Sequence, residues 1–157
     1  MIIGYFVGIA LIPKILSQKN ALMICAILGF LFTTLAVCTP GNILLHLPII
    51  DLMTLESVQL TIPFTVLFIA LLGIANSLMW PAIWPLALDG VGKYIKLGSA
   101  LLIMAIAGGA VLPLVYGLMA DSLGTQTAYL INIPCYLFIF YFAFHGHLIG
   151  KKRHQDK

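Results

Sequence analysis

The sequence predicts an all-α protein, a polytopic bundle of about five helices that cross a lipid bilayer. Composition is the first reason, because 62% of the 157 residues are hydrophobic and only 8% are charged, against about 25% charged in soluble domains. The second reason is that the apolar residues form five runs, most of them near the roughly 20 residues that a membrane-spanning helix needs. The third is that every Lys and Arg lies in alternate breaks between these runs.

A basic tail at 149–157 follows five apolar runs, which cover about residues 1–16, 21–38, 61–88, 97–119 and 127–148. The first run is short and begins directly in apolar sequence. The third is long and is interrupted by Pro63, Pro81 and Pro85. The break before it, about 39–59, is still fairly apolar, so we expect it to lie along the membrane interface or to form a short amphipathic helix. The runs together predict one transmembrane bundle over 1–148.

The charged residues predict the topology of this bundle. All the basic residues flank two of the breaks or lie in the tail, and they are Lys14, Lys19, Lys93, Lys96, Lys151, Lys152, Arg153 and Lys157. The breaks between them hold acids instead, namely Asp51, Glu56 and Asp121. Basic loops of polytopic proteins face the cytoplasm. We therefore expect a multi-pass protein of the cell (inner or plasma) membrane, with a cytoplasmic C-terminus and, after five crossings, an N-terminus outside.

Several classes of protein are disfavoured by this sequence. A nucleic-acid-binding protein carries basic residues over a folded face, whereas here they occupy loops and a tail, so we expect no nucleic-acid partner. The runs hold no Ser/His pair, paired Asp or cluster of metal-ligating His, so we expect neither an enzyme nor a cofactor or metal site. The runs also hold no ionisable group well inside the membrane, which is where a proton-coupled pump needs one.

The third run carries the most unusual chemistry. Gly73, Asn76, Trp80 and Trp84 recur at three- and four-residue spacing, which places them along one face of a helix. An amide offers hydrogen-bond donors and an acceptor, and an indole offers a flat apolar face. This combination suits a sugar, whose hydroxyls would meet the amide and whose C–H face would meet the ring. We therefore predict that Asn76, Trp80 and Trp84 bind substrate.

Ordinary structural roles stay open for two of these residues. Trp84 lies where tryptophans commonly anchor a helix at the membrane interface, and this is its more frequent role. Asn76 is as well suited to a hydrogen bond with a neighbouring helix as to a substrate contact. Trp80, directly before Pro81 and one helical turn from Asn76, is therefore the preferred binding residue.

A second group of residues is predicted to act in helix packing or gating. Prolines in the third run free backbone carbonyls, and interrupted helices often line transport sites. The fourth run is rich in small residues, which let helices approach closely in lipid. Tight packing is the plain role of most of them, and rocking of one helix against another is the functional one. The predicted members of this group are Gly73, Pro81, Gly108, Gly109 and Pro113.

The stretch from Asn76 to Gly124 resembles the C-terminal half of the major facilitator superfamily, and within it the fucose/glucose/galactose permease family. The resembling segments are Trp80-Pro81-Ala82-Ile83-Trp84, the loop glycines Gly90 and Gly92, Gly98-Ser99, Gly108-Gly109, Pro113, and Gly117 to Gly124. The resemblance implies that the five runs are helices 8–12 of a twelve-helix carrier, with helix 8 entered from outside. It also implies that Trp80 lines the sugar site.

By this resemblance the protein is a sugar symporter, a secondary active transporter that moves a monosaccharide of the fucose, glucose or galactose type by alternating access. Its partners would be that sugar, a coupling proton or sodium ion, and the lipid bilayer. The coupling site and most sugar contacts are then expected in helices 1–7. We expect the chain to be a truncated C-terminal half that is inactive alone. The alternative is a small non-catalytic membrane subunit that assembles with another membrane chain.

Overall fold

The computed structural model describes Phe6, residues 17–50 and residues 57–148. Within this part, four helical segments are long and apolar enough to cross a membrane, namely Gln18–Cys38, Phe64–Leu88, Gly92–Leu123 and Thr125–Leu148. They correspond to the second, third, fourth and fifth predicted runs, and they confirm an all-α membrane helix bundle. Apart from Phe6, the predicted first run and the basic tail lie outside the described residues.

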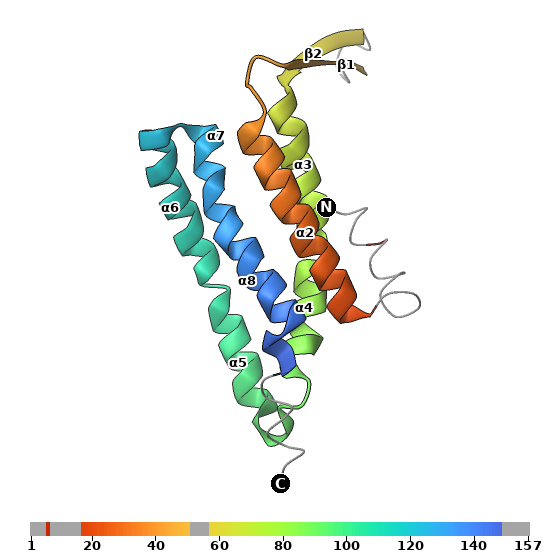
Figure 1. Ribbon diagram of the computed structural model, residues 1–157, viewed down its shortest axis with the longest axis vertical. Coiled ribbons are helices and arrows are strands. Elements are labelled where there is room, and N and C mark those ends of the chain that lie inside the picture. The colour runs from red at the N-terminus through yellow and green to blue at the C-terminus, as the bar shows by residue number, and fades with distance from the viewer. Residues whose placement is uncertain (1–5, 7–16, 51–56, 149–157) are drawn as a thin grey trace.

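Figure 1 shows how these segments are divided into helices. The first is α2 (Gln18–Cys38), and the second consists of α3 (Phe64–Ser77) and α4 (Met79–Leu88). The third consists of α5 (Ile95–Ala105) and α6 (Gly108–Leu123). The fourth begins with the short α7 (Thr125–Ala128) and continues as α8 (Asn132–Phe144). Short 3-10 turns lie at Gly92–Tyr94, Tyr129–Ile131 and Gly146–Leu148.

Helix α2 is the centre of the packed part of the bundle. It lies against α8 and also against α3 and α4. The core that these helices share consists of Leu22, Cys25, Leu72, Met79, Ala82, Leu86, Tyr136 and Ala143. Helices α5 and α6 lie outside this core, and none of their residues is buried. Lipid tails are as apolar as leucine, so such a face is compatible with a membrane, where packing rather than hydrophobicity drives helices together.

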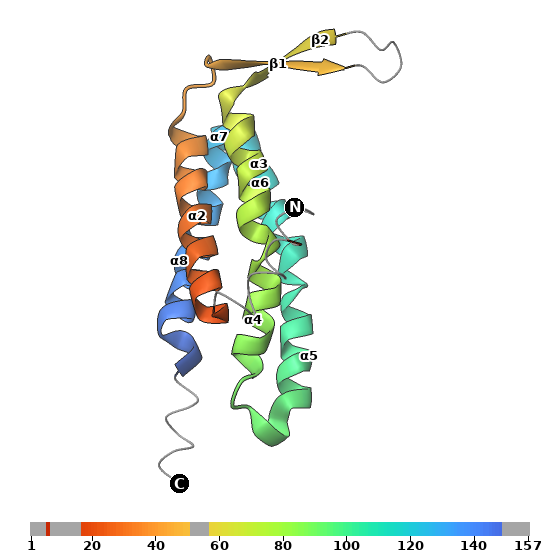
Figure 2. The ribbon, with the colours of Figure 1, turned by 90° about the vertical axis from the view of Figure 1, so that its right-hand side faces the viewer.

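The charges of the described residues divide between the two ends of the bundle. Lys19, at the start of α2, lies 5.8 Å from the ring centroid of Phe144 at the end of α8, so these two helix ends meet. The turn before α5, with Lys93, and the start of α5, with Lys96, lie at that same end of the bundle in Figures 1 and 2. The end of α6, with Asp121, lies at the other end (Figures 1 and 2). The spans therefore alternate in direction as the charge pattern predicts.

The connection between α2 and α3 is a β-hairpin, which projects beyond the helices in Figure 2. Strand β1 (Leu44–Ile50) pairs antiparallel with β2 (Ser57–Pro63). His46 lies opposite Thr61, with its ring nitrogen Nδ1 3.0 Å from the threonine hydroxyl. The prediction of a short amphipathic helix here was wrong, because Pro40 and Pro48 oppose a helix while the surrounding Val, Ile and Thr residues favour strands. The third span accordingly begins at Phe64 rather than near residue 61.

Two of the spans are interrupted near their middle, and the first of these is the third predicted run. Helix α3 ends at Ser77 and α4 begins at Met79, with Leu78 between them at φ −98° and ψ −10°. Pro81 lacks the N–H that would bond to the Ser77 carbonyl, and its ring crowds that carbonyl. Pro85, one turn further along in α4, likewise lacks an N–H to donate. The interruption therefore follows from the prolines.

The second interrupted span is the fourth predicted run, between α5 and α6. The backbone tightens to 3-10 bonds there, from the Ala107 N–H to the Met104 carbonyl at 3.0 Å and from the Gly109 N–H to the Ile106 carbonyl at 2.8 Å. The pair Gly108-Gly109 lowers the helix propensity at this point. Pro113, inside α6, lacks the N–H that would bond to the Gly109 carbonyl. Sequence reasoning treated these residues as packing residues and did not predict the break.

Candidate functional site

The two tryptophans of the chain lie next to each other on α4. Their ring centroids are 5.7 Å apart and the rings are inclined by 56°, because a four-residue spacing brings side chains onto one face of a helix. Trp80 is 45% exposed, and Trp84 is partly exposed. We call Asn76, Trp80 and Trp84 the tryptophan face. Its two indoles form an aromatic surface of the kind that accepts the apolar face of a ligand ring.

Asn76 lies one helical turn before Trp80 and is bonded to α8. The Tyr136 hydroxyl donates a hydrogen bond of 3.0 Å to the Asn76 carboxamide oxygen Oδ1. This is the interhelical bond that the sequence left open as an alternative role. The NH₂ group of the same amide makes no hydrogen bond with any residue that the structure describes. One end of the amide therefore serves the bundle, while the other end is still a donor without a partner in the described chain.

Tyr136 is held in place by a close fit against α2. Its side chain is only 5% exposed, and a Cβ atom added at Gly29 would lie 2.3 Å from the tyrosine Cε1 atom. No side chain larger than hydrogen fits there without a shift. Thr33 lies one turn further along α2 from Gly29. The Thr33 hydroxyl is fully buried and meets ordinary hydrogen-bond geometry with none of the described residues.

Three of the packing or gating candidates, Gly108, Gly109 and Pro113, lie in α6. Gly108 and Gly109 are exposed, and no atom lies within 4 Å of a Cβ built at either. Pro113 lines a cavity of about 250 Å³ together with Tyr116, Tyr129 and Asn132. The structure therefore does not bring these residues to the tryptophan face. Gly73 and Pro81, on α3 and α4, are both partly exposed.

Sequence reasoning missed Tyr136 as a functional candidate. Its only signal is a tyrosine in the middle of an otherwise apolar run, where a hydroxyl needs a partner when it is buried. The partner could not be identified, because spacing along one helix says nothing about which face of another helix it meets. Gly29 gave no signal beyond being a small residue within α2.

Comparison with known proteins shows similarity to proteins named as sugar transporters. It is 35% identical over 150 residues to the glucose/galactose transporter of Brucella abortus, a match that covers 96% of this chain and 30% of that protein. It is 31% identical over 150 residues to a putative glucose/galactose transporter of Helicobacter pylori, covering 92% of this chain and 31% of that protein.

A third relative is the L-fucose-proton symporter of Escherichia coli, which is 37% identical over 68 residues, covering 43% of this chain and 16% of the symporter. The chain thus spans less than a third of the length of the curated relatives it matches. No protein-family model matches the sequence, and no solved structure matches it. On the similarity to these three relatives, the chain belongs to the fucose/glucose/galactose permease family of the major facilitator superfamily.

Proposed function

We propose that the chain is part of a secondary active transporter that moves a monosaccharide of the glucose, galactose or fucose type together with a proton or a sodium ion. The observation that supports this most is the similarity, over at least 92% of the chain, to two proteins named as glucose/galactose transporters. The relative named L-fucose-proton symporter adds a precedent for coupling to a cation. All three names are those of transporters, which agrees with a protein that is not an enzyme.

The tryptophan face supports a sugar as the ligand. Sugar rings have an apolar C–H face and a polar rim, so a site for them combines a flat aromatic surface with hydrogen-bonding groups. Trp80 offers such a surface, because it is 45% exposed and lies beside Trp84. The NH₂ group of Asn76 offers a donor one turn away. Trp80 is the principal contact in this proposal, and Asn76 and Trp84 are secondary ones.

Alternating access accounts for the two interrupted spans and for the uncovered helices. In this mechanism one helical bundle rocks against another around a site near the middle of the membrane, which interrupted helices often line. Helices α5 and α6 expose Leu101, Leu114 and Leu118, among other apolar side chains. The region matched by this chain is only 30% of the Brucella abortus relative. In this proposal the five predicted runs are helices 8–12, and helices 1–7 cover that face.

The coupling cation is assigned to helices 1–7 for a chemical reason. A charged residue inside a membrane is costly and usually functional. The charged residues in the described spans lie near their ends, at Lys19, Asp89, Lys93, Lys96 and Asp121. The chain alone is therefore expected to be inactive, since its described spans offer a sugar-binding surface without a charged residue at the same depth.

Sugar uptake tests this proposal. In cells that lack galactose carriers, the chain is produced alone or as a joined carrier, in which it replaces the matched region of the Brucella abortus transporter. We expect uptake of radiolabelled galactose by the joined carrier and none by the chain alone. If the intact Brucella transporter is active in these cells and the joined carrier reaches the membrane without supporting uptake, the proposal is wrong.

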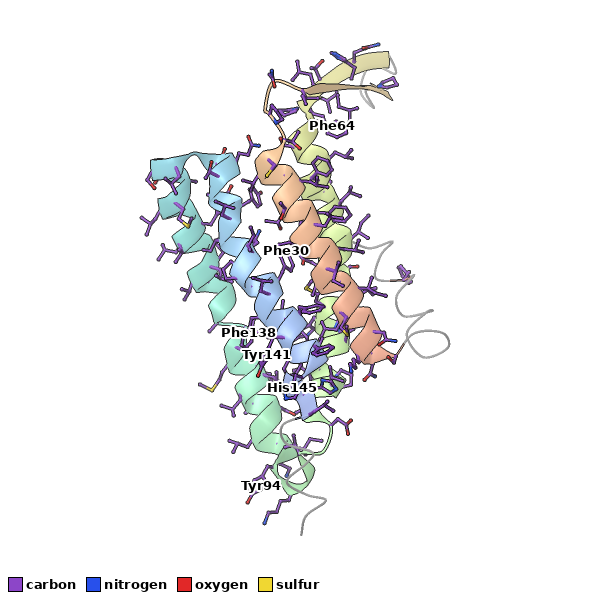
Figure 3. The ribbon with its side chains drawn as sticks, in the orientation of Figure 1. Phe30, Phe64, Tyr94, Phe138, Tyr141 and His145 are labelled. Carbon is purple, nitrogen blue, oxygen red and sulfur yellow. The ribbon has the colours of Figure 1, made fainter. Side chains whose placement is uncertain are left out.

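A substitution at Trp80 tests the assigned site within the same joined carrier. We expect Trp80→Ala to lower galactose uptake at least about tenfold, because an aromatic contact is worth about 0.5–1.5 kcal/mol beyond its buried area. The matched control is Phe138→Ala on α8 (Figure 3), which removes an aromatic ring that is 70% exposed and belongs to a different span. Equal galactose uptake by the two variants at equal membrane levels would show that Trp80 is not part of the sugar site.

A small non-catalytic subunit is the second candidate, and the uncovered face of α5 and α6 fits it as well, since a partner chain would cover that face. The two proposals differ in what they require. A subunit would co-purify with a different membrane protein when produced at native levels, and the joined carrier would show no uptake.

A further inference from the structure

We propose that Tyr136 is a positioning residue of the sugar site, and that it fixes the Asn76 amide so that Asn76 meets the sugar as a hydrogen-bond donor. The inference rests on the proposed function, because it names the chemistry by which that site would recognise its substrate. It concerns a residue on α8, in a different span from the tryptophan face.

The first step is that the acceptor end of the amide is already used. The Tyr136 hydroxyl donates to Asn76 Oδ1 at 3.0 Å. A carboxamide carries its acceptor and its donors on opposite sides, so engaging the oxygen leaves the NH₂ group for a ligand. The sugar atom that it meets must then be an acceptor, either a hydroxyl oxygen or the ring oxygen.

The second step is that Thr33 determines which group donates in the hydrogen bond between Tyr136 and Asn76. A tyrosine hydroxyl both donates and accepts, so by itself it would tolerate a flipped amide. The Thr33 hydroxyl, one turn from Gly29 on α2, is fully buried and forms no hydrogen bond with any described residue. Because a buried hydroxyl without a hydrogen bond is costly, its proton is best directed to the phenol oxygen. The tyrosine proton is thereby directed to Asn76.

The third step is that the phenol is closely packed on the side that faces α2. The Tyr136 ring occupies the space that a side chain at Gly29 would need, and the residue is 5% exposed. The ring thus packs against α2 and is bonded to α3, so in this proposal the orientation of the amide is set before the sugar arrives. A group held in this way loses less freedom on binding, which raises affinity.

The first test uses Tyr136→Phe, which keeps the ring against Gly29 and removes the hydroxyl. Galactose uptake by the joined carrier should show a KM raised about fivefold to tenfold, as expected for the loss of one hydrogen bond of roughly 1 kcal/mol, with little change in Vmax. The control is Tyr141→Phe, the same chemical change on the same helix (Figure 3) at a side chain that is 53% exposed. Its KM should stay within about twofold of the wild-type value.

The second test has a readout that a merely structural role would not move. Deoxy-galactoses lack one hydroxyl, whereas deoxyfluoro-galactoses keep an acceptor there but no donor. At one ring position, the fluoro analogue should compete with galactose uptake several-fold better than the deoxy analogue. In Tyr136→Phe, where the amide can flip, this ratio should fall to about one, and in Tyr141→Phe it should persist. Thr33→Val should give a smaller change in the same direction.

The outcomes separate this inference from the function on which it rests. Uptake by the wild-type joined carrier, together with an unchanged KM and analogue ratio in Tyr136→Phe, would overturn the role of Tyr136 and leave the transport proposal standing. If Tyr136→Phe does not reach the membrane, Thr33→Val decides, and an unchanged ratio in that variant overturns the inference. Absence of uptake by the wild-type joined carrier would overturn both proposals.

Discussion

Among single residues, Gly29 decides how closely α2 and α8 approach. A Cβ atom at this position would lie 2.3 to 2.7 Å from three atoms of the Tyr136 ring. Both partners are buried, so a methyl group added at Gly29 would force the ring or the backbone to shift. The hydrogen bond between Tyr136 and Asn76 therefore depends on a glycine of α2, a helix that carries neither bonding partner.

We expect Gly29→Ala to destabilise the folded chain by about 1–3 kcal/mol, because overpacking a close contact forces side chains or backbone to shift. Thermal unfolding in detergent would measure this as a midpoint several degrees lower. The matched control is Gly117→Ala in α6, where no atom lies within 4 Å of the added Cβ, and this variant should be neutral or slightly stabilised. An unchanged midpoint for Gly29→Ala would show that the two helices are less tightly packed than described.

The site was only partly predictable from the sequence, and the residues show why. Spacing alone predicted that Trp80 and Trp84 share a face, since neighbours on one helix follow from its geometry. Spacing could not distinguish the two roles of Asn76, because its partner Tyr136 is 60 residues away in the chain. Contacts between helices depend on how each helix is rotated about its axis, which an apolar sequence on all sides does not reveal.

At the level of elements, the end of α2 is tied to the start of the last span by one side chain. Gln126 in α7 donates from Nε2 to the backbone carbonyls of Ala36, Val37 and Thr39, at 2.8, 3.1 and 2.6 Å. The last carbonyls of a helix have no partner within the helix. The glutamine supplies that partner close to the point where the chain leaves α2 for the hairpin.

We expect Gln126→Leu to destabilise the fold by about 1–3 kcal/mol, because it leaves these carbonyls without the donor that satisfies them. Hydrogen exchange should show faster opening of the last turn of α2 before any change in α4. Gln59→Leu is the control, since Gln59 is exposed in β2 and makes none of these bonds. Equal exchange at the end of α2 in the two variants would mean that Gln126 does not cap this helix.

The predicted spans and the observed ones agree closely where length and hydropathy decide the outcome. The runs at 21–38 and 127–148 became Gln18–Cys38 and Thr125–Leu148. The hairpin was missed because its apolar residues resemble an interfacial helix in composition, and only strand pairing across 44–63 distinguishes the two. The break between α5 and α6 was missed because Gly108 and Gly109 were interpreted as packing or gating residues and not as a weak point in the helix.

At the scale of the whole molecule, the described spans form one packed group and one outlying span (Figure 1). Helices α2, α3, α4 and α8 share a core, whereas α5 and α6 lie beside it in Figures 1 and 2. Near its end, α6 is joined to the last span by a hydrogen bond of 3.1 Å, which the Tyr116 hydroxyl donates to the Thr125 carbonyl. This layout suits a chain whose remaining apolar surface is covered by further helices.

The central claim is that consecutive spans alternate across the membrane with their basic ends in the cytoplasm, as in a carrier of this family. Labelling with a membrane-impermeant thiol reagent tests it most directly, in a background where Cys25, Cys38 and Cys135 are replaced. In intact cells, a Glu56→Cys variant should be labelled from outside, and a Lys93→Cys variant only after the membrane is opened. Labelling of Lys93→Cys from outside, with Glu56→Cys protected, would contradict the account.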